Sequence, residues 1–301
     1  MEQLVQQLAA GLSNGAIYAL MALALVMIFV STSHINFAQG EMAMFSTYLA
    51  WAGMQSGLSF WPALAVTVAA SFLIGISVER LVVRPLRDAP HLSIVVVFIA
   101  LLAIFHAFAG AIWGFALKAV PSPFADWTVV SNPYLGPHQL GMLAVTGMML
   151  AAILAFFRCT RLGLAMRAAA ENPTSARLSG IPVDTLLALG WGMAAGIGAV
   201  AGCLVAPVLY LEPGMMSGVL LYGFAAALVG GISNPAGAVA GGFIVGIVEN
   251  LVAFLGARFE AATGIYVFGT GEKLTLALVI IVAMLVVKPG GLFSGHRRER
   301  A

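Results

Sequence analysis

The sequence predicts an all-α integral membrane protein, a polytopic bundle of about eight to nine transmembrane helices with a helical elbow on its cytoplasmic side. Composition is the first observation behind this prediction. Of the 301 residues, 61% are hydrophobic and 9% are charged, and the mean hydropathy is +1.01, whereas soluble domains carry roughly 25% charged residues. A soluble chain of this length would need the missing charges to cover its surface. Lipid is therefore the expected solvent.

The second observation is a series of apolar segments close to the length of about 20 residues that a helix needs to cross the hydrocarbon core. We place the spans at residues 9–30, 37–55, 61–82, 92–117, 139–157, 186–210, 218–232, 236–255 and 274–288. Segments 218–232 and 274–288 are short for a perpendicular crossing, and the first is either a span or a re-entrant segment that protein must cover. Residues 1–301 are expected to form a single transmembrane domain.

The third observation is the distribution of Lys and Arg, which are retained on the cytoplasmic side during membrane insertion. If the N-terminus is outside and nine spans follow, 11 of the 14 basic residues lie on the inner side. These are Arg80, Arg84, Arg87, Arg158, Arg161, Arg167, Arg177, Lys288, Arg297, Arg298 and Arg300. The sequence thus predicts an outside N-terminus and a cytoplasmic C-terminus.

Several classes of function are disfavoured. The net charge of +2 comes from basic residues spread over loops, so no nucleic-acid partner is expected. The spacing of Cys159 and Cys203 indicates neither a disulfide nor a metal site, and we interpret them as two packed thiols. No hydrolytic or redox constellation is present, so we expect neither enzymatic activity nor a cofactor.

A phosphate-binding loop is also absent from the sequence. Such a loop needs Gly-Lys-Ser/Thr, and the lysines at 118, 273 and 288 follow Leu, Glu and Val. If transport is active, its energy must come from another subunit or from an ion gradient.

Residues 158–184 form the longest polar connection on the inner side. An alanine-rich helix is expected from Leu164 to Glu171, followed by a second helix with Asn172 as its N-cap and Pro173 at its first position. Gly180 should end that second helix. The resulting elbow is either an interfacial element that rests on anionic lipid headgroups or a docking surface for a soluble partner.

Few ionisable groups lie deep in the spans, where they would mark an ion or substrate pathway. They are Glu41, Glu249 and His106. Each also has a structural interpretation. Glu41 is near enough to the interface to be solvated, His106 can donate to a backbone carbonyl, and Glu249 can pair with Asn250 or a neighbouring helix. Glycines spaced four residues apart, such as Gly242 and Gly246, either pack helices closely or line a conduit.

The chain resembles the permeases of branched-chain amino-acid ABC transporters along nearly its whole length. The residues that carry the resemblance are Gly11-Leu-Ser-Asn-Gly-Ala-Ile-Tyr-Ala-Leu20, Ile35-Asn-Phe-Ala-Gln-Gly-Glu41, Gly163-Leu-Ala-Met-Arg-Ala-Ala-Ala-Glu-Asn172, Gly180-Ile181, the run from Gly230 to Gly242, and Lys288-Pro-Gly-Gly-Leu-Phe293. Two positions depart from the common pattern. Gln39 stands where many members have His, and Tyr222 stands where many have Lys.

The resemblance implies a subunit of a bacterial inner-membrane importer. Two permeases would form the pathway, two ATPases would hydrolyse ATP, and an extracytoplasmic binding protein would deliver branched-chain or other mostly hydrophobic amino acids. The elbow, about residues 158–185, would couple to the ATPases. The expected coupling residues are Arg167, Glu171, Asn172, Pro173, Gly180 and Ile181, and the expected pathway residues are Asn36, Gln39, Gly40, Glu41, Tyr222 and Glu249. Urea or short amides as substrates, a stand-alone secondary carrier or channel, and a non-transporting membrane scaffold remain alternatives.

Overall fold

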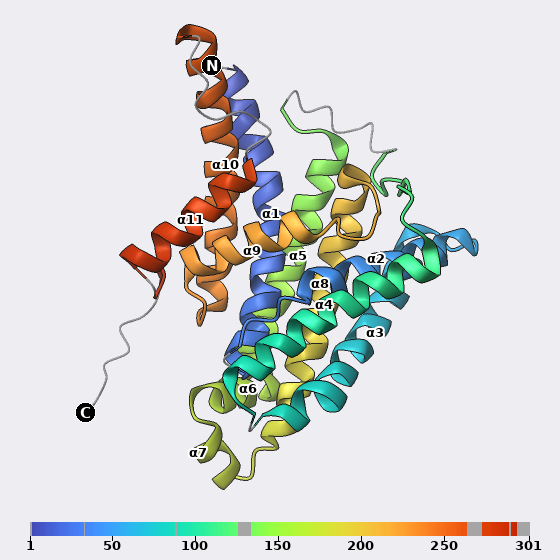
Figure 1. Ribbon diagram of the computed structural model, residues 1–301, viewed down its shortest axis with the longest axis vertical. Helices are drawn as coiled ribbons and strands as arrows, with labels where there is room; N and C mark the ends of the chain where they lie inside the picture. The colour runs from blue at the N-terminus through green and yellow to red at the C-terminus, as the bar shows by residue number, and fades with distance from the viewer. Residues whose placement is uncertain are drawn as a thin grey trace.

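The computed structural model describes residues 2–32, 34–87, 89–125, 134–263, 273–288 and 290–293, and these residues are almost entirely helical (Figure 1). The helices are α1 (Glu2–Thr32), α2 (Gln39–Gln55), α3 (Phe60–Val78), α4 (His91–Trp113), α5 (Pro137–Cys159), α6 (Arg161–Glu171), α7 (Pro173–Leu178), α8 (Val183–Leu209), α9 (Ser217–Gly230), α10 (Pro235–Thr263) and α11 (Lys273–Val287). Helix α3 continues through a π turn, Glu79–Val83, and a 3-10 turn, Arg84–Leu86.

Six of the described helices are long and apolar enough to cross a membrane. They are α1, α3 with its continuation, α4, α5, α8 and α10. Helices α9 and α11 are apolar but have only 14 and 15 residues. At 1.5 Å per residue, α9 is about 21 Å long, less than the roughly 30 Å hydrocarbon core. The all-helical membrane class is confirmed, while the number of eight to nine spans stays a prediction.

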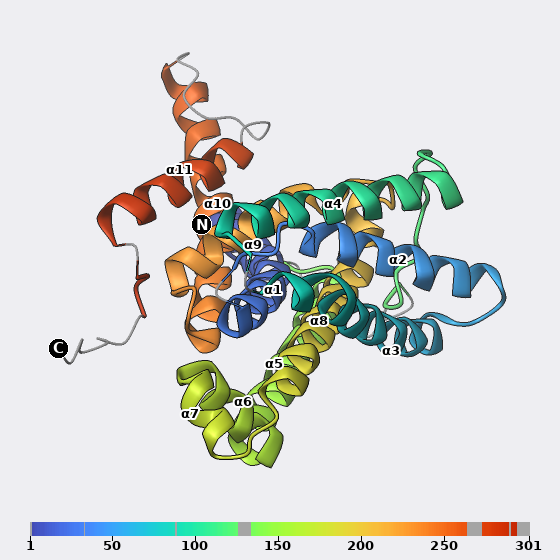
Figure 2. The same cartoon turned by 60° about the horizontal axis from the view of Figure 1, so that its bottom comes forward.

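Helices α1 and α10 lie side by side and antiparallel (Figures 1 and 2). They approach so closely that a Cβ added to Gly246 would lie 2.4 Å from the Cα of Gly15, and one added to Gly242 would lie 2.4 Å from the Cα of Ala19. Only glycine permits this contact. The glycines at 242 and 246 therefore pack helices, as small residues do in membrane bundles.

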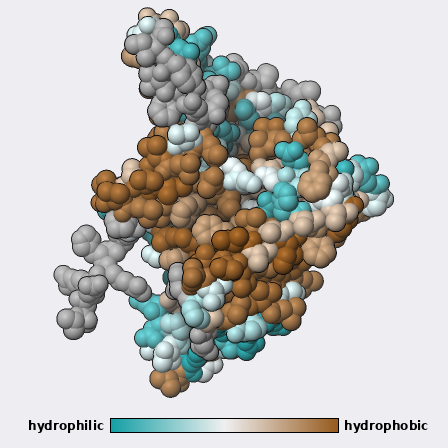
Figure 3. Space-filling view, in the orientation of Figure 1, coloured by the Kyte–Doolittle hydropathy of each residue, from teal (hydrophilic) through white to brown (hydrophobic). Residues whose placement is uncertain are grey.

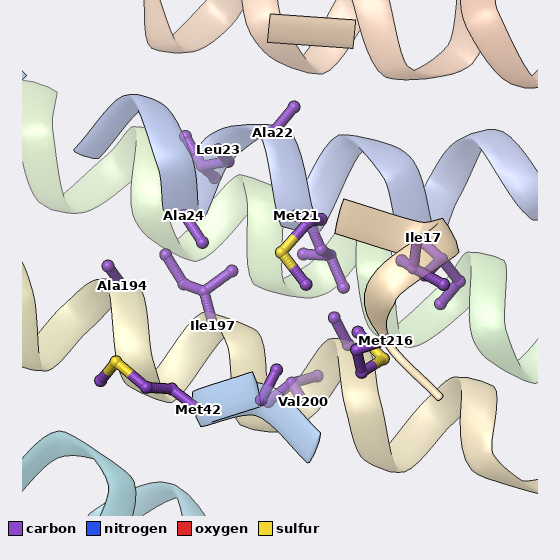
Figure 4. Close-up of a cluster of buried hydrophobic side chains, with 14 of the residues drawn as sticks. Ile17, Met21, Ala22, Leu23, Ala24, Met42, Ala194, Ile197, Val200 and Met216 are labelled. Atoms are coloured by element: carbon purple, nitrogen blue, oxygen red, sulfur yellow. The ribbon is translucent and has the colours of Figure 1, made fainter. Parts of the chain in front are cut away.

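The core lies between α1, α2 and α8 (Figure 4). Its side chains are apolar and almost fully buried, and they include Ile17, Met21, Leu23, Met42, Ile197, Val200 and Met216. Buried methionines from three segments belong to this cluster, where unbranched side chains fill irregular gaps between helices.

The connections between the helices lie at two ends of the molecule. Figure 1 shows the N-terminus beside the end of α10 at the top, with α6 and α7 at the bottom. Arg84 Nη2 lies 3.0 Å from Asp184 Oδ2, which places the α3–α4 connection beside the elbow. Figure 3 shows apolar residues over the middle of one face and hydrophilic residues around the elbow. The predicted topology requires these two connections on the same side.

Two expectations about individual segments are wrong. The fourth helix ends at Trp113 rather than at residue 117, because Gly114 adopts φ +79°, a left-handed conformation that terminates the helix. Cys159 is exposed at the end of α5, whereas Cys203 is buried within α8. Only Cys203 is therefore a packed thiol.

Candidate functional site

The N-terminal ends of α2 and α9 meet inside the bundle. A Cβ added to Gly40, in the first turn of α2, would lie 3.2 Å from the Cβ of Leu220 and 3.4 Å from the backbone oxygen of Met216. Figure 1 shows both helices crossing the middle of the molecule at a steep angle to α1. Gly40 thus serves close helix packing, and the polar residues beside it are brought to the start of α9.

Asn36 and Gln39 hold the start of α2 in place. The Asn36 Oδ1 accepts a hydrogen bond from the Ala38 amide at 3.0 Å, and its Nδ2 points to the Met42 sulfur at 3.7 Å. The Gln39 Nε2 donates to the Ala194 carbonyl on α8 at 2.9 Å. Both side chains are buried, and the Gln39 Oε1 has no hydrogen-bond partner among the described residues. Asn36 and Gln39 therefore position this backbone.

Glu41 and His106 form an ion-pair geometry between α2 and α4. Their Oε2 and Nδ1 atoms are 3.3 Å apart, and the side chains are 5% and 39% exposed, respectively. The burial of Glu41 shows that the expected solvation at the interface is wrong, because α2 begins inside the bundle rather than at its rim. His106 faces this carboxylate, so the expectation of a backbone carbonyl partner is replaced by a side-chain contact across helices.

A second polar cluster joins α1, α9 and α10. The Tyr18 hydroxyl donates to Glu249 Oε2 at 2.8 Å. The Tyr18 and Tyr222 rings stack at 4.6 Å between centroids with an interplanar angle of 15°. Asn250 instead donates to the Gly246 carbonyl at 2.9 Å. Glu249 therefore pairs with a neighbouring helix, one of the two structural interpretations expected for it.

The sequence predictions missed Tyr18, which connects two of the expected pathway residues. A tyrosine in an apolar run has no local signal that distinguishes a core ring from a hydrogen-bond donor. Both clusters adjoin α9. The first lies at its start, because His106 is next to Gly214 in the segment before α9, and the second includes Tyr222 in the second turn of α9. The His106 Cε1 is 3.6 Å from the position of a Cβ on Gly214.

The elbow has the capping chemistry that its sequence predicts. The Asn172 Oδ1 accepts from the Ser175 amide at 2.9 Å, Pro173 begins α7, and Gly180 adopts φ +77° after that helix ends. The Ile181 amide then donates to the Ala176 carbonyl at 3.0 Å. The first helix starts earlier than expected, at Arg161 rather than Leu164, because the Thr160 hydroxyl caps it.

Arg167 and Glu171, the two charged residues expected to couple to the ATPases, lie on the surface of the elbow. Arg167 and Glu171 are exposed, and neither makes an ion pair or a side-chain hydrogen bond within the described part of the chain. A small apolar cluster of Ala169, Ala176, Val183 and Leu186 holds α6 and α7 against the start of α8. The elbow is thus packed on one side and open on the other.

Asp184 joins the elbow to the connection between α3 and α4, and the sequence predictions did not identify it. Its carboxylate receives Arg84 at 3.0 Å and Arg177 at 3.1 Å, together with a hydrogen bond from Arg87. Arg87 also contacts the buried carboxylate of Glu79. One carboxylate therefore connects the α3–α4 connection, α7 and α8. We call these five residues the Asp184 network.

These arrangements hold polar groups but do not assemble a metal site in the described residues, where no group of three or more His, Cys, Asp or Glu side chains comes together. Their side chains form ion pairs and hydrogen bonds between helices. The two clusters lie within the bundle, and the Asp184 network lies at one end.

The chain is similar to known proteins along most of its length. The family model described as the permease component of branched-chain amino acid transport systems matches residues 7–289. The chain is 31% identical to the high-affinity branched-chain amino acid transport system permease protein LivH of Salmonella typhimurium, over 98% of this chain and 97% of that protein. LivH of Escherichia coli K12 gives the same identity and coverage.

More distant proteins also match over most of the chain. The probable branched-chain amino acid transport permease protein LivH of Methanocaldococcus jannaschii is 29% identical over 91% of this chain and 87% of that protein. Among solved structures, PsaBC from Streptococcus pneumoniae in complex with Fab aligns with a TM-score of 0.49 at 11% identity, covering 94% of this chain and 92% of that one.

Proposed function

This chain belongs to the family of permease components of branched-chain amino acid transport systems, and we propose that it is the membrane-spanning subunit of an ATP-binding-cassette importer. The proposed cargo is a branched-chain or other mostly hydrophobic amino acid. The observation that carries the proposal is the family match over residues 7–289, which includes the elbow and both buried clusters.

The proposed complex contains a second permease, two ATPase subunits and an extracytoplasmic binding protein. The absence of Gly-Lys-Ser/Thr from the sequence supports ATP hydrolysis in separate subunits. The proposed location is the bacterial inner membrane, with the N-terminus outside and the elbow in the cytoplasm. The concentration of arginine in the α3–α4 connection and the elbow supports that orientation.

The elbow is the proposed ATPase contact within a single transmembrane domain of residues 1–301. Arg167 and Glu171 are exposed and have no ion-pair partner in the part of the chain that the structure describes. The residues Asn172, Pro173, Gly180 and Ile181 shape the turn that holds them. The Asp184 network supports this role, because an elbow braced against the α3–α4 connection and the start of α8 passes a rigid-body push into α3, α4 and α8. A loosely attached loop would absorb the same push.

The proposed pathway lies beside α9. Glu41 and His106 stand at its start, Tyr222 and Glu249 stand farther along, and Asn36, Gln39 and Gly40 set the backbone from which Glu41 projects. Buried ionisable groups in a membrane protein are functional candidates because they are costly to keep there. They also support the alternative of a secondary carrier coupled to an ion gradient.

The test is co-purification in mild detergent of this chain with its genomic neighbours. A stoichiometric ATPase with a phosphate-binding loop is expected, and Arg167→Gln with Glu171→Gln should release it. Thr174→Ala, an exposed change on the same elbow, is the matched control and should retain the ATPase. A chain that purifies alone and whose solute uptake collapses with the ion gradient would support the carrier instead.

A further inference from the structure

The last described residues of the chain, 290–293, contact the turn between α9 and α10, and we call them the strap. The Leu292 amide donates to the Val229 carbonyl at 2.8 Å. The Asn234 Nδ2 donates to the Phe293 carbonyl at 2.9 Å, across 59 positions of the sequence. The strap therefore joins two of the motifs that the chain shares with branched-chain permeases, and the proposed function assigns a role to neither.

The strap fits the turn closely because both backbones have glycine at the contact. A Cβ added to Gly291 would lie 2.4 Å from the Cα of Gly231 and 2.8 Å from the carbonyl oxygen of Leu228. These distances are well below the 3.5–4.0 Å at which carbon atoms pack, so even the side chain of alanine would push the strap away from the turn. Gly291 is therefore the position at which the smallest substitution displaces the strap.

The strap also satisfies a backbone group at the end of α9. The last four carbonyl groups of a helix have no donor within the helix, and unsatisfied backbone at membrane depth is costly unless protein covers it. The Gly231 amide donates to the Ala227 carbonyl at 2.8 Å, and the Leu292 amide is the donor for Val229. The strap is thus a cap for α9 that comes from a distant part of the sequence.

Asn234 holds the strap and caps α10 with the two ends of one amide. Its Oδ1 accepts a hydrogen bond from the Gly237 amide at 3.1 Å, as the side chain of an N-cap residue does, and its Nδ2 donates to Phe293. An ionised carboxylate has acceptors only. Aspartate at this position would therefore keep the cap of α10 and lose the hydrogen bond to the strap.

The strap is held through its backbone rather than by buried side chains. The side chains of Leu292 and Phe293 are each 47% exposed, so they bury little apolar surface. One hydrogen bond contributes a factor of about 2–12 to the equilibrium between a bound and a released segment. The backbones of α9 and α10, by contrast, are in direct contact, because a Cβ added to Gly230 would lie 2.0 Å from the Gly237 oxygen. The strap can therefore open while α9 and α10 stay paired.

The strap lies at the cytoplasmic end of α9 in the proposed orientation. Helix α10 runs antiparallel to α1, so its start lies toward the end of the molecule opposite the N-terminus, where Figure 1 shows α6 and α7. Helix α9 adjoins His106 at its start and carries Tyr222 in its second turn. The strap thus contacts the inner end of the helix beside which the proposed pathway lies.

We propose that Asn234 is a positioning residue that holds the strap on the end of α9 and so keeps the cytoplasmic end of the pathway closed between transport cycles. When the strap opens, the end of α9 loses its cap and becomes free to move. This inference rests on the proposed importer function and adds a closure to its pathway.

The test compares Asn234→Asp with Ser233→Asp, which adds the same charge at an exposed neighbouring position. Each variant is reconstituted with its partner subunits in vesicles that are loaded with labelled L-leucine. In Asn234→Asp, hydrogen exchange of the strap amides and ATP-independent leucine efflux should both rise by about 2–12-fold, because both follow the population of the released strap. The KM for leucine import should not change, because the strap does not contact the substrate. Ser233→Asp should match the wild type in all three measurements.

A second pair of variants displaces the strap by steric contact. Gly291→Ala should raise both hydrogen exchange and efflux, whereas Gly147→Ala, at a glycine on α5 that faces open space, should change neither. Agreement between Gly291→Ala and Asn234→Asp would exclude an effect on the cap of α10, since residue 291 takes no part in that cap.

Faster exchange at the strap with efflux at the wild-type rate would overturn the closure and leave the importer function intact. Unchanged exchange in Asn234→Asp, or an equal rise in Ser233→Asp, would overturn the role of the Asn234 amide. If the wild-type complex does not accumulate leucine in the presence of ATP, the importer function fails and this inference fails with it.

Discussion

Asp184→Asn is expected to loosen the elbow without unfolding the bundle. In the wild type, one carboxylate, 38% exposed, contacts Arg84, Arg87 and Arg177, whose side chains are 49%, 24% and 58% exposed. Exposed ion pairs contribute roughly 0.2–1 kcal/mol each. The pair with Arg87 is the least exposed and belongs to the upper part of that range.

The three contacts share one carboxylate, so we expect their loss to cost about 1–2 kcal/mol in total, which corresponds to a factor of about 5–30 in the equilibrium between a docked and a released elbow. Hydrogen exchange of the amides in residues 160–182 should accelerate by that factor, because these amides exchange through local opening. Exchange in α8 beyond residue 190 should not change.

The functional readout is the number of substrate molecules imported per ATP hydrolysed. Asp184→Asn should lower this ratio while ATPase binding is retained, and Glu260→Gln, at the other end of the molecule, serves as the control. High salt should lower the ratio of import to ATP hydrolysis in the wild type toward that of the variant, because salt screens exposed ion pairs. Unchanged exchange together with an unchanged ratio would refute the role assigned to the Asp184 network.

Three further predictions concern stability. Tyr18→Phe removes the hydrogen bond to the buried Glu249 carboxylate on α10 and should lower the free energy of unfolding in detergent by about 1.5–3 kcal/mol. A variant as stable as the wild type would show that this hydrogen bond does not stabilise the fold. Gly246→Val forces side-chain atoms into the backbone of α1 and should cost about 1–3 kcal/mol or prevent folding, whereas Gly147→Val should shift stability by no more than about 0.5 kcal/mol. Gly180→Ala places a side chain at φ +77° and should lower the free energy of unfolding by about 1–2 kcal/mol and increase proteolysis of the elbow. Equal rates of cleavage in the variant and the wild type would argue against this left-handed turn.

Local chemistry was the part of the structure that could be predicted from the sequence. Asn172, Pro173 and Gly180 each act within four residues of themselves, so capping and turn rules correctly placed the end of α6 and both ends of α7. The apolar character of the long helices followed from composition in the same way. Boundaries set by a single residue were missed by a few positions, such as the start of α6 at Arg161, which the Thr160 side chain caps.

Contacts between distant segments were outside the reach of sequence reasoning. Asp184 and Arg87 are 97 positions apart, and Tyr18 and Glu249 are 231 positions apart. Neither pair has a local pattern. The burial of Glu41 was missed because hydropathy gives the span of α2 but not its tilt, which places the first turn of the helix inside the bundle.

The most direct test of the account is uptake of labelled L-leucine into vesicles that contain this chain, its partner permease, the ATPases and the binding protein. The account predicts accumulation that requires ATP and hydrolysis-competent ATPases and that persists when ion gradients are collapsed. Uptake that continues without ATP and disappears with the ion gradient would contradict it.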